Sequence, residues 1–133
     1  MKEKAGKIAG LLIVIAGAYF TLSSGNSLHR SLVRNRYLAI GYITAGNSQS
    51  PRSSRVTFTF TYNYKGKAYQ NYSYPYDFTD NVDHSPLFTG KSYAVVIDTT
   101  NPTNSDILLT KAKFDEFSFP YPDSLSWTTQ YLK

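Results

Sequence analysis

Four residues that could bind a metal ion lie close together in one polar segment. They are Asp77, Asp80, Asp83 and His84, and carboxylates with an imidazole can ligate Ca²⁺ or another divalent cation. The segment lacks both the alternating Asp pattern that ends in Gly and the closing bidentate Glu of a calcium-binding loop. We therefore expect a solvated acidic loop that holds no metal or other cofactor, with these four side chains as the candidate ligands if a cation does bind.

Residues for covalent or acid-base catalysis are scarce. The chain has no cysteine and two histidines, His29 and His84, so thiol catalysis and thiolate metal sites are excluded and a hydrolase would lack an evident general base. The motifs of serine hydrolases, zinc proteases and phosphate-binding loops do not occur in the sequence. Asp98 ends an apolar segment before a turn, where a carboxylate typically accepts backbone N–H groups. The sequence thus predicts a protein that is not an enzyme.

Tyrosine is the unusual feature of the composition, with 12 residues in a chain of 133. The segment from Tyr62 to Tyr76 holds more of them than one face of a sheet can bury. In an ideal strand Tyr69 lies on the face opposite Tyr72 and Tyr74. Exposed Tyr side chains suit contacts with proteins or glycans. The candidate binding residues for a partner protein are Tyr69, Tyr72, Tyr74 and Tyr76. Alternatively, the tyrosines form a two-sided aromatic wall or pack against the Phe-rich C-terminal segment.

The elements that position these residues have the two-residue period of β-strands. In the segment 55–64, apolar and aromatic residues alternate with Arg, Thr and Asn, which predicts one buried and one solvated face. Lys65 and Gly66 then close a hairpin. The other expected elements are strands at 39–45, 67–74, 91–98 and 107–109, a polar loop at 75–86, a turn at 101–104 and a short C-terminal helix capped by Asp123 or Ser124. We expect an all-β fold, a small antiparallel β-barrel or sandwich of about five strands.

A charge-free apolar run, Ile8–Leu22, precedes this β domain. It predicts one N-terminal transmembrane helix of marginal length. The alternative is a signal peptide cleaved at Ala16-Gly-Ala18. We favour the uncleaved anchor, because Tyr19 and Phe20 extend the apolar character beyond that site. The segment 27–37 then continues the helix, either within the lipid headgroup layer or as a solvated connection.

The net charge of +5 comes from the first 36 residues, since the chain from Tyr37 onward carries as many Lys and Arg as Asp and Glu. The basic residues that flank the apolar run are Lys2, Lys4, Lys7, Arg30, Arg34 and Arg36. This placement favours contact with a lipid bilayer and disfavours nucleic acid as a partner. We expect residues 1–36 to form the anchor and a basic juxtamembrane helix, and residues 37–133 to form an extramembrane β domain with an aromatic C-terminal extension.

Several motifs occur in an order that matches a known family. They are the apolar N-terminal run, the basic stretch 30–36, the strand start 39–43, the Tyr-rich strand 58–64, Gly66-Lys-Ala-Tyr69 and the segment 90–105 with its Asn101-Pro-Thr-Asn-Ser105 ending. Over residues 8–109 the chain resembles the small bacterial membrane proteins of the domain of unknown function 3592. The resemblance implies an all-β domain beside a bacterial membrane and no established activity.

These features predict a non-enzymatic, membrane-anchored module of the cell envelope that binds a partner protein. We expect a single pass through the bacterial inner membrane. The numbers of cations on the two sides of the apolar run are nearly equal, and the short Lys-rich N-terminus favours a β domain outside the cytoplasm. The alternative is a membrane-anchored immunity or inhibitor protein that neutralises a toxin, since such proteins are small, have a single domain and carry no catalytic residues.

Overall fold

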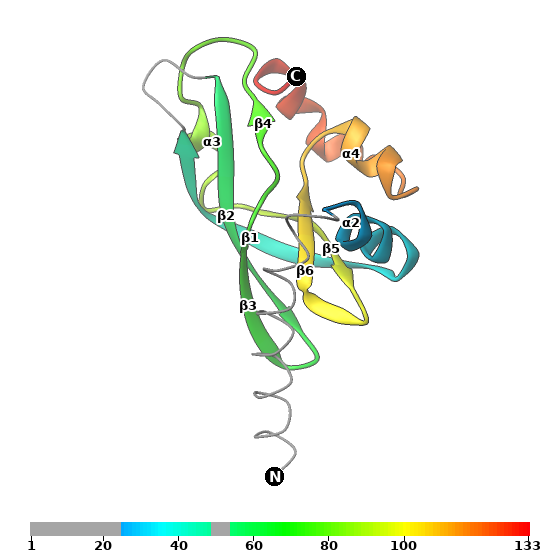
Figure 1. Cartoon of the computed structure of the whole chain (residues 1–133). Coiled ribbons are helices and arrows are strands. Elements are labelled where there is room, and N and C mark those ends of the chain that lie inside the picture. The colour runs from blue at the N-terminus through cyan, green and yellow to red at the C-terminus, as the bar shows by residue number, and fades with distance from the viewer. Residues whose placement is uncertain (1–24, 49–53) are drawn as a thin grey trace.

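The computed structural model describes residues 25–48 and 54–133 (Figure 1). The first described element is the helix α2 (Gly25–Arg34), which leads into the long strand β1 (Arg36–Ser48). The other strands are β2 (Arg55–Tyr64), β3 (Lys67–Tyr72), β4 (Tyr76–Asp77), β5 (Ser92–Asp98) and β6 (Asn101–Leu108). The other helices are α3 (Ser85–Phe88), α4 (Lys111–Glu116) and the 3-10 helix η1 (Asp123–Gln130). The fold is mostly β, as the sequence predicts.

The strands form one antiparallel sheet in the order β3-β2-β1-β5-β6, and β4 pairs with Arg55 and Val56 at the start of β2. The sheet is open, because in the described part of the chain β3 and β6 share no backbone ladder. A side chain of β3 nevertheless forms hydrogen bonds to β6. The Asn71 amide donates hydrogen bonds to the Thr103 carbonyl oxygen at 3.1 Å and to Ser105 Oγ at 2.9 Å. The sheet therefore curls toward closure without the continuous ladder of a barrel.

The inner face of the curled sheet carries the main core. Phe58 and Phe60 of β2 are fully buried and Tyr62 is nearly so, as the alternation in this strand predicts. Thr59 was expected on the solvated face, but its side chain is buried as well. Its Oγ1 accepts a hydrogen bond from Asn47 Nδ2 at 3.1 Å, beside an irregularity in the pairing of β1 with β2. The irregular pairing shields a polar position that a regular strand would expose.

Helices cover only part of the outer face of the sheet. The strand register pairs Leu38 with Val96 and Ile40 with Ala94, so these four side chains share the outer face. Val96 is fully buried where α2 packs on β5, and Figure 1 shows α2 and α4 beside β5 and β6. The side chain of Ile40, on the central strand β1, is 74% exposed. An apolar residue this exposed at the middle of a sheet marks a surface that residues 25–48 and 54–133 leave uncovered.

The expected basic helix is present but shorter than predicted. It ends at Arg34, and Arg36 already begins β1 within the segment that we expected to be helical as far as Tyr37. Among residues 25–48 and 54–133, no helix is long and apolar enough to cross a membrane. Outside the described residues lie the apolar run Ile8–Leu22 and its flanking Lys2, Lys4 and Lys7.

Three local predictions are wrong. The segment 75–86 is not a plain polar loop, because it contains β4 and α3, and the ring of Phe78 is buried against Phe88 with centroids 6.3 Å apart. Burial of a Phe side chain outweighs the polar composition around it. The residues 101–104 begin β6 and do not form a turn. The C-terminal helix is a 3-10 helix with Pro122 as its N-cap, and no side chain caps it.

Candidate functional site

A groove of about 330 Å³ opens where the two edges of the sheet meet. Its walls come from α2, from the end of β3 with the residues that follow, and from the start of β6. Residues along the groove include Leu28, Tyr72, Tyr74, Asn101 and Asn104. The Asn104 amide is held in place, because it donates hydrogen bonds to the Leu28 carbonyl oxygen at 2.8 Å and to Asp98 Oδ2 at 3.2 Å. The groove is thus polar on the β6 side and joined to α2.

Asp98 holds the walls of this groove together. Its Oδ1 accepts hydrogen bonds from the N–H and the hydroxyl of Thr100 at 2.8 and 2.6 Å, which confirms the predicted side-chain turn. Its Oδ2 accepts from Ser31 Oγ of α2 at 2.6 Å and from Asn104. Burial alone would raise the pKa of the carboxyl group, but these hydrogen bonds outweigh it and hold the pKa below its usual value. Asp98 is therefore ionised and connects α2 to β6 through its hydrogen bonds to Ser31 and Asn104.

Tyr72 and Tyr74 are the exposed aromatic residues of the groove, with 63% and 45% of their surface accessible. The backbone between them is fixed, because Ser73 is buried and exchanges two hydrogen bonds with the Phe58 main chain at 2.8 and 2.9 Å. The Nζ atom of Lys113 lies 4.9 Å from the centroid of the Tyr74 ring. Partial burial raises the pKa of the Tyr74 hydroxyl, which therefore stays protonated as a hydrogen-bond donor. Both rings are held on a rigid segment.

The other two candidate tyrosines stabilise the fold. Tyr76, which we expected to be exposed, is 5% exposed. Its hydroxyl donates to the Ile107 carbonyl oxygen at 2.6 Å and accepts from the Leu109 N–H at 3.2 Å, and burial raises its pKa well above the usual value. Tyr69 is half-buried and stacks on Tyr62 with ring centroids 5.4 Å apart. The expectation that the Tyr76 ring is exposed for contact with a partner is wrong, because the ring is almost completely buried.

The residues of the acidic segment each have a local partner. Asp80 Oδ1 lies 2.7 Å from His84 Nε2, and this hydrogen bond lowers the pKa of the Asp80 carboxyl group. Asp83 accepts a hydrogen bond from the first N–H of α3 at 3.0 Å, and Asp77 Oδ1 lies 3.7 Å from Arg55 Nε. In the described ranges 25–48 and 54–133, no three His, Asp or Glu side chains gather as metal ligands would. The geometry does not bring the four candidate ligands around a common point.

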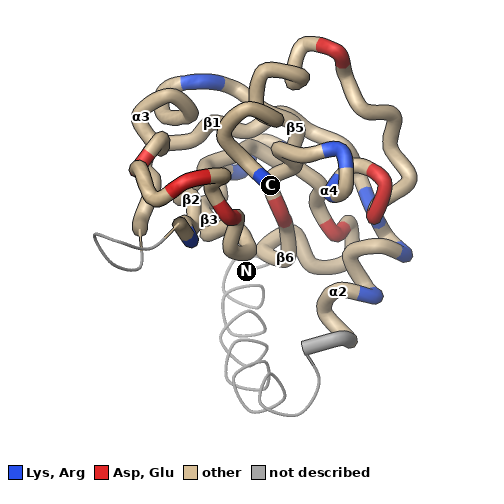
Figure 2. Tube along the Cα trace, turned by 90° about the horizontal axis from the view of Figure 1, so that it is seen from above, with Lys and Arg blue, Asp and Glu red and all other residues tan. Residues whose placement is uncertain are grey.

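A buried carboxylate, Asp106, begins a chain of charged side chains that the sequence analysis did not find. Lys113 Nζ lies 3.2 Å from Asp106 Oδ2 and 3.5 Å from Glu116 Oε2, and Glu116 Oε1 lies 3.1 Å from His29 Nε2. Figure 2 shows the blue and red segments of α4 close to α2. Burial raises the pKa of Asp106 to about 6, although Lys113 opposes the shift. The fully buried Asp106 of β6 thus contacts α4 through Lys113, and α4 contacts α2 through Glu116 and His29.

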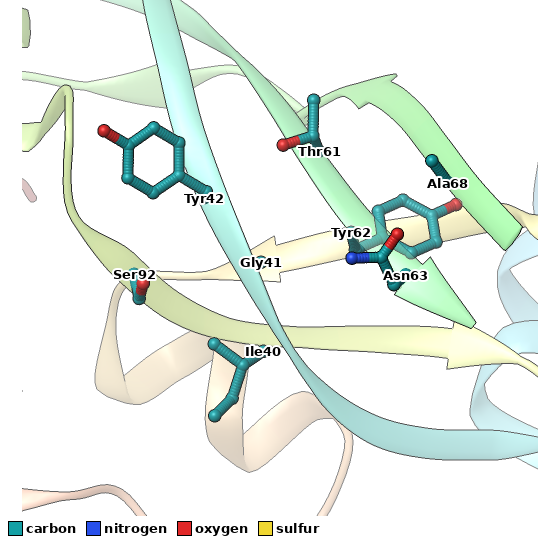
Figure 3. Close-up of a pocket in the computed structure, with 8 residues that line it drawn as sticks. All are labelled: Ile40, Gly41, Tyr42, Thr61, Tyr62, Asn63, Ala68 and Ser92. Carbon is teal, nitrogen blue, oxygen red and sulfur yellow. The ribbon is translucent and has the colours of Figure 1, made fainter. Parts of the chain in front are cut away.

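A second hollow, of about 380 Å³, lies over the uncovered half of the outer face (Figure 3). Ile40 and Tyr42 of β1 border it on one side, and Thr61 and Asn63 of β2 border it on the other. Its lining residues include no carboxylate, imidazole or amine. The lining is therefore made of apolar, hydroxyl and amide groups.

The chain matches no family model, no curated protein and no solved structure. The resemblance to the domain of unknown function 3592 stays a prediction. The groove and the outer face must be interpreted from their own chemistry.

Proposed function

We propose that this protein is a non-enzymatic, membrane-anchored module of the bacterial cell envelope that binds a partner protein through the groove between α2, β3 and β6. The observation that carries the proposal is the pair of exposed tyrosines, Tyr72 and Tyr74, on the wall of that groove. Tyr and Trp side chains supply much of the binding energy at protein interfaces, because they bury a large area and lose little conformational entropy.

The rest of the groove complements the two rings. Asn101 brings an amide N–H group and Asn104 an amide oxygen that suit the backbone of a polypeptide, while the Asn104 N–H groups and the Thr103 hydroxyl hold the wall together, and Leu28 adds an apolar contact. Asp98 and Ser73 fix the walls on both sides, so that little order has to be created on binding. A preformed polar groove with aromatic anchors favours an interaction module over an enzyme.

The membrane part of the proposal is supported by the sequence. The apolar run Ile8–Leu22 ends shortly before α2, and basic residues flank it on both sides. A single-pass anchor would place the β domain next to the inner membrane, and we propose that the domain lies outside the cytoplasm. Carbonate-washed membranes should retain the full-length chain, and a mature N-terminus at Tyr19 would contradict the anchor.

The groove is tested by site-specific photo-crosslinking in the full-length protein in its native membrane. A photoreactive phenylalanine analogue replaces Tyr72 in one variant and Leu87 of α3, which is 41% exposed, in the matched control. We expect a discrete adduct from position 72 alone. Tyr74→Ser should lower its yield about tenfold or more, since an aromatic anchor contributes about 2 kcal/mol. Equal adducts at both positions would contradict the proposal, and a toxin in the adduct would favour the immunity alternative.

A further inference from the structure

An acidic segment and a basic hairpin lie at the two ends of strand β2. At its first residue, Arg55 pairs with Asp77, and the acidic segment 77–83 follows. At its last residue, Tyr64 pairs with Lys67, and Lys65 forms the hairpin tip. A strand of ten residues is about 30 Å long, so the acidic segment and the basic hairpin lie at opposite ends of the molecule.

The start of β1 lies at the same end as the basic hairpin. The ring of Tyr37 contacts the ring of Tyr64, with centroids 5.5 Å apart, and Arg36 is the first residue of β1. We call this region the basic end, and its exposed cations are Arg34, Arg36, Lys65 and Lys67. In the segments 34–40, 62–69 and 97–101 that build it, the only carboxylate is Asp98, which is buried and hydrogen-bonded. The basic end therefore presents a surplus of positive charge.

Apolar and amphipathic side chains lie between these cations. Ile40 is 74% exposed, Tyr37 50% and Leu38 44%. The ladder between β1 and β2 begins at Gly41, and residues 36–40 pair with β5 alone, so the two strands diverge. The gap between them forms a cleft of about 640 Å³ that is lined by residues 37–40 and 63–65. The segment after Pro122 borders Ile40 on its other side and brings one exposed carboxylate, Asp123.

We propose that the basic end docks on the anionic lipid headgroups of the membrane that anchors the chain. This inference rests on the membrane anchor in the proposed function. Lys and Arg near an anionic surface each add attraction to it, and Tyr with exposed aliphatic side chains suits the headgroup boundary. The sequence leaves two residues between Leu22 and α2, and a helix of ten residues is about 15 Å long. This short connection keeps the start of β1 within reach of the lipid surface.

The charge pattern favours a bilayer over a protein as the occupant of this end. The four cations lie in pairs on two separate segments, 34–36 and 65–67, on either side of an apolar centre, which matches a laterally extended anionic surface. Lys65 and Lys67 keep their amines 5.5 and 5.4 Å from the rings of Tyr64 and Tyr69, so each ring and its cation would enter the headgroup layer together. An acidic protein partner is the alternative that the experiment separates.

The absence of cysteine from the sequence allows a single label at a chosen position. The full-length protein is reconstituted into vesicles of phosphatidylcholine alone or with 30% phosphatidylglycerol, with a dye on Ala68→Cys at the basic end or on Val82→Cys at the acidic end. Lipids that carry a quencher at the headgroup report the approach of the label. We expect strong quenching at position 68 in the anionic vesicles, several-fold less in the neutral vesicles, and little at position 82 in either.

Charge variants test the contact itself. Lys65→Gln with Lys67→Gln should lower the ratio of docked to undocked protein about tenfold or more, while the matched pair Lys111→Gln with Lys133→Gln should leave it unchanged. Unchanged Trp127 fluorescence shows that each variant is folded. A protein that does not float with either type of vesicle would contradict the anchor. For a protein that floats with the vesicles, two results count against docking: equal quenching in both lipids, and quenching that the lysine substitutions do not change. Either result would overturn the docking of the basic end without contradicting the anchor, and an acidic protein would then be the occupant.

Discussion

Replacement of Asp106 by Asn should stabilise the protein at neutral pH and have little effect in acid. The carboxyl group is fully buried, and its pKa is raised to about 6 from an unfolded value near 3.8. A carboxyl group whose pKa is higher in the folded state favours folding most when it is protonated. Its contribution is present below about pH 4 and is lost as the pH rises through about 6. A shift of two pKa units corresponds to about 3 kcal/mol.

The Asn side chain is uncharged at every pH, as the protonated acid is. It retains the oxygen that accepts the Ile107 N–H, which lies 2.9 Å from Asp106 Oδ1, and Lys113 keeps Glu116 as a partner. The free energy of unfolding of Asp106→Asn should therefore equal that of the parent near pH 4 and exceed it by about 3 kcal/mol at pH 7.5.

Urea unfolding of the full-length protein in detergent micelles, followed by the fluorescence of the single Trp127, measures this difference. Asp115→Asn is the control, because Asp115 forms an exposed ion pair with Lys111 and should change stability little at any pH. A difference that does not vary between pH 4 and pH 7.5 would refute the reasoning. So would a variant that is less stable at pH 7.5, because Lys113 would then hold Asp106 ionised with a net gain.

Three further substitutions test the fold by the same assay. Phe58→Ala should cost about 3–5 kcal/mol, because its ring is fully buried, while Thr57→Ala should shift the urea midpoint little; equal effects would mean that the strand is misassigned. Gly41→Ala should cost about 1–3 kcal/mol, because the new methyl group collides with the Val95 side chain, and an unchanged midpoint would contradict this. Asp98→Asn should cost about 1–3 kcal/mol at pH 7, and the loss should shrink as the pH falls below the ordinary carboxyl pKa of 3.8 and through the lowered pKa of folded Asp98; a loss independent of pH would show that the charge is not involved.

Local patterns in the sequence were sufficient to predict strand β2, its hairpin and the turn at Asp98. The alternation from Arg55 to Tyr64 identifies both the strand and its buried face, since each side chain reports its own orientation. The hairpin also follows from local chemistry: Lys65 and Gly66 both adopt positive φ, at 51° and 77°, and Gly does so without strain. Asp98 is a third case, because a side-chain turn involves only neighbouring residues.

The features that the sequence did not predict depend on contacts between distant segments. Tyr76 lies in a polar stretch, and only its pairing with Val56 and its hydrogen bonds to β6 bury it. Asp106 is buried because α4 and α2 cover its strand, and its partner Lys113 arrives from another element. The groove is formed where β3 approaches β6, and the Asn71 bridge that joins these edges spans more than thirty residues of sequence. The periodicity of a strand indicates which face of the strand is buried, but it does not indicate which distant segment packs on that face.

The two proposed surfaces are separated along one rigid strand. β3 begins at Lys67 in the basic end and finishes at Tyr72 on the wall of the groove. Five steps of a strand span about 17 Å, so a domain that rests on its basic end would hold the tyrosine pair above the lipid headgroups and turn the acidic segment away from them. A lipid-bound basic end would set the height of the groove, because β3 connects the two surfaces directly. Such an arrangement favours a partner that is itself held at the membrane, since the groove and the binding surface of that partner could then lie at the same height above the lipid.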